Sequence, residues 1–179
     1  MTQFEFASVF ASILYGLGIA HLFTNAIQQL YRKRLEFLQI AYAALTFQVM
    51  LVSWWGLFIF SDVETWTFEQ FFVLVAQSVA FFGMCVALFP PVDDAVNTFE
   101  SHRRPFLLLL SLSAVLDAVQ AAQFGKLFSP FLYPLFIVQL PALALLAMWI
   151  RSHRFQIVVA VYLSLAVAFW AFLGRHVVG

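Results

Sequence analysis

Charged side chains are scarce in this sequence. Lysine, arginine, aspartate and glutamate make up 10% of the 179 residues, and hydrophobic residues make up 64%. Soluble domains carry about a quarter charged residues, and a soluble fold with so few would expose large apolar patches to water. Lipid removes this difficulty, because the outer surface of a membrane protein can be as apolar as its core. The composition therefore predicts an integral membrane protein in contact with the lipid bilayer.

Cysteine and sequence motifs of known chemistry are nearly absent as well. The single Cys85 excludes an intrachain disulfide, a paired-thiol redox motif and a cysteine zinc site. The sequence also lacks the GxGxxG, Walker A, GxSxG and HExxH motifs. Nine basic residues balance nine acidic ones without a basic run interleaved with aromatic residues, so nucleic acid is not an expected partner. These absences favour a protein that is not an enzyme, and we expect no catalytic residue, cofactor or metal.

Long apolar runs dominate what is present. A transmembrane helix needs about 20 mostly apolar residues, and six segments qualify: residues 6–31, 37–60, 68–89, 105–124, 130–150 and 155–173. The first is too long for the apolar core of a signal peptide and has no basic residues before it. The runs are continuous rather than alternating, which disfavours a β-barrel. We predict one all-α domain over residues 1–179, a bundle of six transmembrane helices in a bacterial-type inner membrane.

The basic residues predict the orientation of the bundle. If both termini lie outside, the inner loops hold seven basic residues and the outer side holds two, in agreement with the positive-inside rule. The inner set is Arg32, Lys33, Arg34, Arg103, Arg104, Arg151 and Arg154, and the outer set is Lys126 and Arg175. An even number of helices is required for the termini to share a side.

Short matches suggest an internal repeat. Phe37-Leu38 and Trp55 in the second segment match Phe131-Leu132 and Trp149 in the fifth at the same offset. Two three-helix units in tandem would have opposite orientations, which is an inverted-repeat plan found in transporters. In a sequence this rich in Phe, Ala and Val, chance also produces such matches.

Polar residues at membrane depth are the candidate functional residues, because lipid makes them costly. In the fourth segment Ser113, Asp117 and Gln120 follow i, i+4, i+7 spacing and share one helix face. In the first segment a second polar face carries His21, Asn25 and Gln28.

Side by side, these two faces would form a polar track through the membrane with His21 and Asp117 near its centre. Such a pair can exchange a proton near neutral pH. The structural alternative is a buried interhelical hydrogen bond from Asp117 to His21 or to a glutamine. Gln139 lies between two prolines of the fifth segment and either lines the track or satisfies a carbonyl freed by a proline.

Three functions follow from this pattern. The first is a small transporter or channel, expected to be a homo-oligomer because six helices leave little room for a wide cavity, that moves protons, ions or a small solute. The second is a non-catalytic subunit or ligand-binding adaptor that docks a protein partner through cytoplasmic loops 32–34 and 90–104. The third is a membrane enzyme acting on a lipid through loop residues, for which the candidates are Asp93, Asp94, Glu100, His102 and His153.

Overall fold

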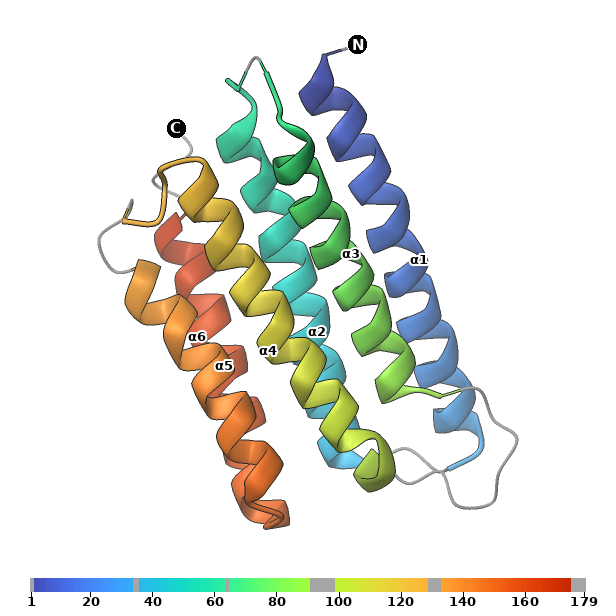
Figure 1. The fold of residues 1–179 in the computed structure, drawn as a ribbon. Coiled ribbons are helices and arrows are strands. Elements are labelled where there is room, and N and C mark those ends of the chain that lie inside the picture. The colour runs from blue at the N-terminus through green and yellow to red at the C-terminus, as the bar shows by residue number, and fades with distance from the viewer. Residues whose placement is uncertain (1, 34–35, 64, 91–98, 129–132, 175–179) are drawn as a thin grey trace.

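Six α-helices and one short 3-10 segment form a single bundle in the computed structural model, which describes residues 2–33, 36–63, 65–90, 99–128 and 133–174. In chain order they are α1 (Gln3–Tyr31), α2 (Phe37–Gly56), η1 (Leu57–Phe60), α3 (Phe68–Leu88), α4 (Phe99–Gln123), α5 (Tyr133–Trp149) and α6 (His153–Gly174). Successive helices alternate in direction (Figure 1). We call the end where α1 begins and α6 finishes the top end, as it stands in Figure 1, and the opposite end the bottom end.

Five of the helices are long and apolar enough to cross a membrane: α1, α2 continued by η1, α3, α4 and α6. The fifth helix, α5, is a shorter apolar helix of 17 residues with a length of about 25 Å. Many large apolar side chains point outward, and Leu165, Phe169 and Phe172 on α6 are each more than 60% exposed. The protein is therefore an integral membrane protein whose helices contact lipid.

Local sequence explains where two helices begin. Thr2 accepts a hydrogen bond from the backbone N–H of Glu5, whose carboxylate accepts one from the N–H of Thr2. Thr67 and Gln70 make the same reciprocal pair at the start of α3. Such capping boxes satisfy N–H groups that have no partner within the first turn of a helix.

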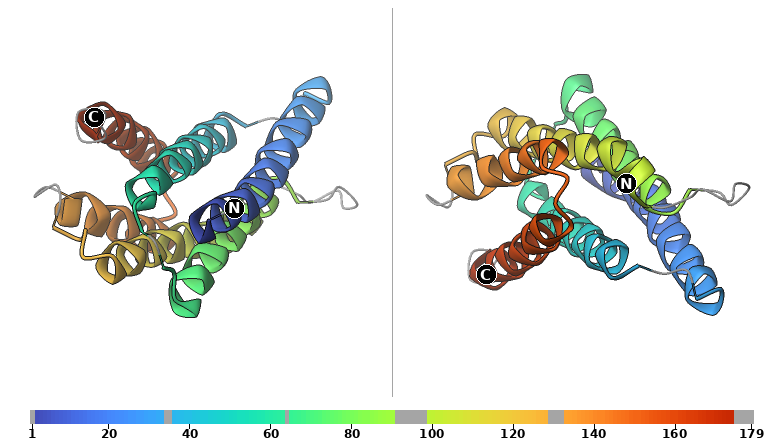
Figure 2. Two further views of the ribbon diagram at one scale, coloured as in Figure 1. Left: turned by 90° about the horizontal axis from the view of Figure 1, so that it is seen from above. Right: turned by 90° about the horizontal axis from the view of Figure 1, so that it is seen from below.

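The third helix lies at the centre of one side of the bundle, with α1 on one flank and α4 on the other, while α5 packs on α4 and α2 on α6 (Figures 1 and 2). Gly18 allows α1 to approach its neighbours closely. A Cβ atom there would lie 3.0 Å from the Met50 side chain and 3.6 Å from the Phe82 Cα. Small residues at helix contacts have this effect in membranes generally.

The fourth helix differs from the sequence-based prediction. It begins at Phe99 rather than at residue 105, so that Pro105 lies inside the helix. Proline is tolerated within membrane helices when neighbours supply the missing contacts. Residues 102–104 consequently belong to the helix and not to a loop, and Asp117 lies about 9 Å from the top end of α4 rather than at its middle.

The helix pairings do not show the internal repeat. In a repeat of two three-helix units, α4, α5 and α6 would correspond to α1, α2 and α3. The contact between α1 and α3 would then have an equivalent between α4 and α6. The contact between α2 and α6 would likewise have an equivalent between α5 and α3. Neither pairing is among the main contacts of the described helices.

Candidate functional site

A cavity of about 800 Å³ occupies the top half of the bundle. Its walls come from α2, η1, α3, α4, α5 and α6, and most of its lining is apolar. Ligand sites in proteins span about 300–1,000 Å³ and combine apolar walls with a few placed polar groups. The cavity has this composition, since its polar residues include Gln77, Ser113, Asp117 and Gln120.

Asp117 is held in the cavity wall by two neutral donors from neighbouring helices. The Gln77 amide nitrogen on α3 donates to Oδ1 at 3.1 Å, and the Tyr133 hydroxyl on α5 donates to Oδ2 at 2.6 Å. No basic side chain forms an ion pair with Asp117 among the residues that the structure describes. A carboxylate in a low-dielectric site is costly unless a cation or a proton compensates it, so this group can bind either one.

Two amide side chains that line the cavity have unused hydrogen-bonding capacity. Gln120 is 2% exposed and lines the cavity, and its Nε2 has no hydrogen-bond partner. The Oε1 atom of Gln48 on α2 also lines the cavity wall without a partner. An unpaired buried polar atom costs about 1–3 kcal/mol, so a bound molecule or water that satisfies these atoms would be stabilised.

Ser113, the third residue of the predicted face on α4, also lines the cavity. Its hydroxyl donates to the Leu110 carbonyl at 2.9 Å, which uses its proton within the helix. The structure thus brings the three predicted α4 residues, Ser113, Asp117 and Gln120, to one cavity.

Aromatic rings form part of the cavity wall and contact one another across helices. Trp170 on α6 stacks on Phe136 with centroids 5.1 Å apart and an interplanar angle of 11°, and it contacts the Tyr133 ring at 5.6 Å. At the top end, the Phe60 ring lies 4.3 Å from that of Phe124. These contacts join α5 to α6 and η1 to the end of α4. Tyr133 and Trp170 were not identified from the sequence, because spacing along one helix does not show which neighbouring helix contributes a partner.

The predicted polar face of α1 lies elsewhere. His21 hydrogen-bonds the Phe89 carbonyl at 3.0 Å, just beyond the end of α3, and Asn25 donates to the His21 carbonyl at 2.7 Å. Gln28 is exposed. Because α3 lies between α1 and α4, and no α1 residue lines the cavity among the described residues, the two faces do not meet in one track.

His21 and Gln39 share a structural role at the end of α3. The Gln39 amide donates to the Leu88 carbonyl at 2.6 Å, next to the Phe89 carbonyl that faces His21. The last carbonyls of a helix have no partner within it, and these two side chains satisfy them. Gln139 likewise bridges helices, since its Oε1 accepts from the Tyr162 hydroxyl at 2.9 Å.

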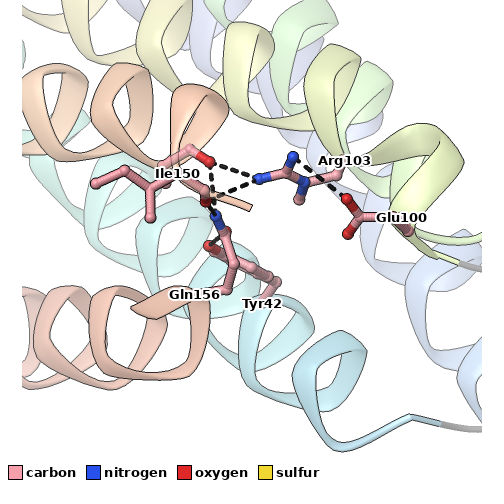
Figure 3. A network of polar contacts seen from close by, with 6 residues as sticks. Tyr42, Glu100, Arg103, Ile150 and Gln156 are labelled. Atoms are coloured by element: carbon pink, nitrogen blue, oxygen red, sulfur yellow. Dashed lines mark hydrogen bonds and ion pairs between the residues drawn. The ribbon is translucent and has the colours of Figure 1, made fainter. Parts of the chain in front are cut away.

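A second polar cluster closes the bottom end (Figure 3). Arg103 is 1% exposed and donates to the carbonyls of Ala147 and Ile150, at 2.6 and 3.3 Å, at the end of α5. Gln156 on α6 donates to the same two carbonyls at 2.6 and 2.7 Å. The Tyr42 hydroxyl of α2 donates to the Gln156 Oε1 at 2.7 Å, so the cluster joins four helices.

The burial of Arg103 corrects its expected role in a docking loop. Its guanidinium contacts the end of α5 and lies 3.3 Å from Glu100, so it is not free to bind a partner. Arg34, Asp93, Asp94 and Arg175 lie outside the described residues. Within the described part of the chain, no group of three His, Cys, Asp or Glu side chains is arranged to hold a metal ion.

No protein-family model, curated protein or solved structure matches this chain.

Proposed function

We propose that the protein is a small membrane transporter whose substrate site is the cavity around Asp117. The observation that carries the proposal is a carboxylate in the wall of an 800 Å³ cavity that is held by neutral donors and lacks a basic partner. Ionisable groups at membrane depth are costly, and they mark substrate or ion pathways. Asp117 would carry a proton or a cationic substrate between the two sides.

The closed bottom half favours a carrier over an open channel. Below the cavity Phe106, Leu107 and Leu110 of α4 are fully buried. At the bottom end Arg103 and Gln156 join α4 and α6 to the end of α5. A substrate could pass only if these contacts separated, as alternating access requires. The bottom polar cluster would then act as the closed gate of an outward-open state.

The membrane topology forms part of the same proposal. In this proposal all six helices, α5 included, span a bacterial-type inner membrane, with the top end outside and the bottom end inside. The distribution of basic residues supports this orientation, because Lys33 and Arg151 are exposed at the bottom end while Lys126 stands at the top. A homo-oligomer was expected because six helices leave little room for a wide cavity. Since one chain contains a cavity of about 800 Å³, that reason no longer applies.

Proton flux into proteoliposomes tests the proposal. The protein is reconstituted with a pH-sensitive dye inside, and a proton gradient is imposed across the membrane. We expect wild-type protein to dissipate the gradient and Asp117→Asn to lose this activity, because an amide cannot carry the proton. The matched control is Asp62→Asn, which removes an exposed carboxylate just beyond η1 and should retain the flux.

Absence of flux in all three folded proteins would contradict proton transport and favour the partner-docking subunit. Equal flux in wild type and Asp117→Asn would contradict the role of the carboxylate.

A further inference from the structure

The composition of the cavity indicates the chemical class of its ligand. We propose that the cavity binds an amine with an apolar body, whose ammonium group contacts Asp117 and whose body lies against the aromatic wall. The inference rests on the proposed function only in taking this cavity as the substrate site. Three features of the cavity support it: its charge, its hydrogen-bonding capacity and the aromatic rings beside Asp117.

The charge of the cavity is complementary to a cation. Asp117 has no basic partner among the described residues, and its two contacts come from neutral groups. Lys126 lines the cavity only at the top end, beyond the last turn of α4, and is itself exposed. An anion near Asp117 would meet like charge in a low-dielectric site, whereas an ammonium group would compensate the carboxylate.

The hydrogen-bonding capacity also favours a donor. Each Asp117 oxygen accepts one hydrogen bond and can accept more. The Gln48 Oε1 is a second buried acceptor without a partner. A primary ammonium group carries three N–H donors and can serve several acceptors at once. The unpaired Gln120 Nε2 remains for a ligand acceptor such as a neighbouring hydroxyl.

Aromatic rings stand beside the carboxylate, as a cation with an apolar body requires. The Tyr133 hydroxyl contacts Asp117 directly, and the Tyr133 ring packs on Trp170. Cations are attracted to the faces of aromatic rings, most strongly to tryptophan. The same rings offer apolar surface to the rest of the ligand.

Some of the side chains that line the cavity also lie at the outer surface of the bundle. Ring contacts join α5 to α6 and η1 to the end of α4. Several lining side chains of α2 and α6 are exposed, with Trp55 at 56% and Phe172 at 67%. A ligand whose apolar body partitions into the membrane could therefore contact part of the cavity lining directly.

Equilibrium binding to purified protein tests the ligand class without any transport. Phenylbutylamine, phenylbutanol and phenylbutyrate have similar apolar bodies and differ in charge at neutral pH. Quenching or shift of tryptophan fluorescence reports binding, because Trp54, Trp55 and Trp170 line the cavity. We expect the amine to bind at least about tenfold more tightly than the alcohol, as a charge-assisted hydrogen bond predicts, and the carboxylate to bind most weakly.

Two variants test whether the selectivity for the amine depends on the Asp117 carboxylate. Asp117→Asn should lower the affinity for the amine at least about tenfold and leave that for the alcohol unchanged, whereas Asp62→Asn should change neither. Equal affinity of wild type for amine and alcohol would overturn the proposal without reference to any variant. Selective amine binding without proton flux would overturn the proposed proton transport and leave the proposed ligand class in place. Asp117-dependent flux without amine selectivity would overturn the proposed ligand class and leave the proposed transport in place.

Discussion

Arg103 and Gln156 should stabilise the bundle cooperatively, because they share their acceptors. Both side chains donate to the carbonyls of Ala147 and Ile150. When either side chain is removed, each carbonyl still accepts a hydrogen bond from the side chain that remains. Loss of both leaves the buried Ala147 carbonyl and the part-buried Ile150 carbonyl at the end of α5 with no side-chain donor. The free energy lost in Arg103→Met with Gln156→Leu should therefore exceed the sum of the two single losses.

The expected loss of unfolding free energy follows from the number of hydrogen bonds that each substitution removes. Hydrogen bonds between membrane helices contribute about 0.6 kcal/mol on average and up to about 1.7. Each single change removes two or three such contacts, and Arg103→Met also relieves the cost of burying a charge, so we expect a loss of about 1–2 kcal/mol for each. An unsatisfied buried carbonyl costs about 1–3 kcal/mol, so the double variant should lose about 2 kcal/mol more than the sum.

The assay is a double-mutant cycle on the free energy of unfolding, measured by denaturing-detergent titration in mixed micelles. Gln139→Leu with Tyr162→Phe provides a matched control, since their side chains hydrogen-bond each other. Either single change breaks that bond, so the control double variant should lose less than the sum. Additive losses for Arg103 and Gln156 would refute the shared-acceptor arrangement.

Two further predictions concern packing and topology. Gly18→Leu should destabilise the bundle by about 1–3 kcal/mol, because even a Cβ meets Met50 at 3.0 Å, while Gly16→Leu should have little effect because nothing lies within 4 Å of its Cβ position. Thermal unfolding in detergent compares the two, and equal midpoints would contradict the close approach of α1. With Cys85 replaced by alanine, Asp62→Cys should react with an impermeant thiol reagent from outside and Ser152→Cys only after permeabilisation, and the reverse pattern would contradict the orientation.

The number and extent of the helices could be predicted from the sequence because lipid imposes a strong requirement. A spanning helix must be continuously apolar over about 20 residues, and α1, α2 with η1, α3 and α6 lie within a few residues of the predicted segments. The start of α4 could not be predicted in the same way. The preceding turn of the helix carries His102, Arg103 and Arg104, which resemble a loop until the partners of Arg103 on α5 and α6 are known.

The candidate site was predicted in part. Helical spacing placed Ser113, Asp117 and Gln120 on one face, and the three line one cavity. Spacing does not identify the neighbour of that face, so α1 was expected where the structure has α3 and α5. The contacts of Asp117 with Gln77 and Tyr133 depend on which helices are adjacent. That property arises from the packing of all six helices and is not encoded in any one of them.

The most direct test of the central claim is whether an aqueous reagent reaches the cavity around Asp117 from the top end. Ser113 and Ser111 are both buried on α4, at 2% and 7% exposed, and both donate to their own helix backbone, but only Ser113 lines the cavity. In protein with Cys85 replaced by alanine, an impermeant thiol reagent added outside reconstituted vesicles should modify Ser113→Cys and leave Ser111→Cys intact, and phenylbutylamine should slow the modification. Equal modification of the two cysteines, or modification of Ser113→Cys only from the inside, would contradict the claim.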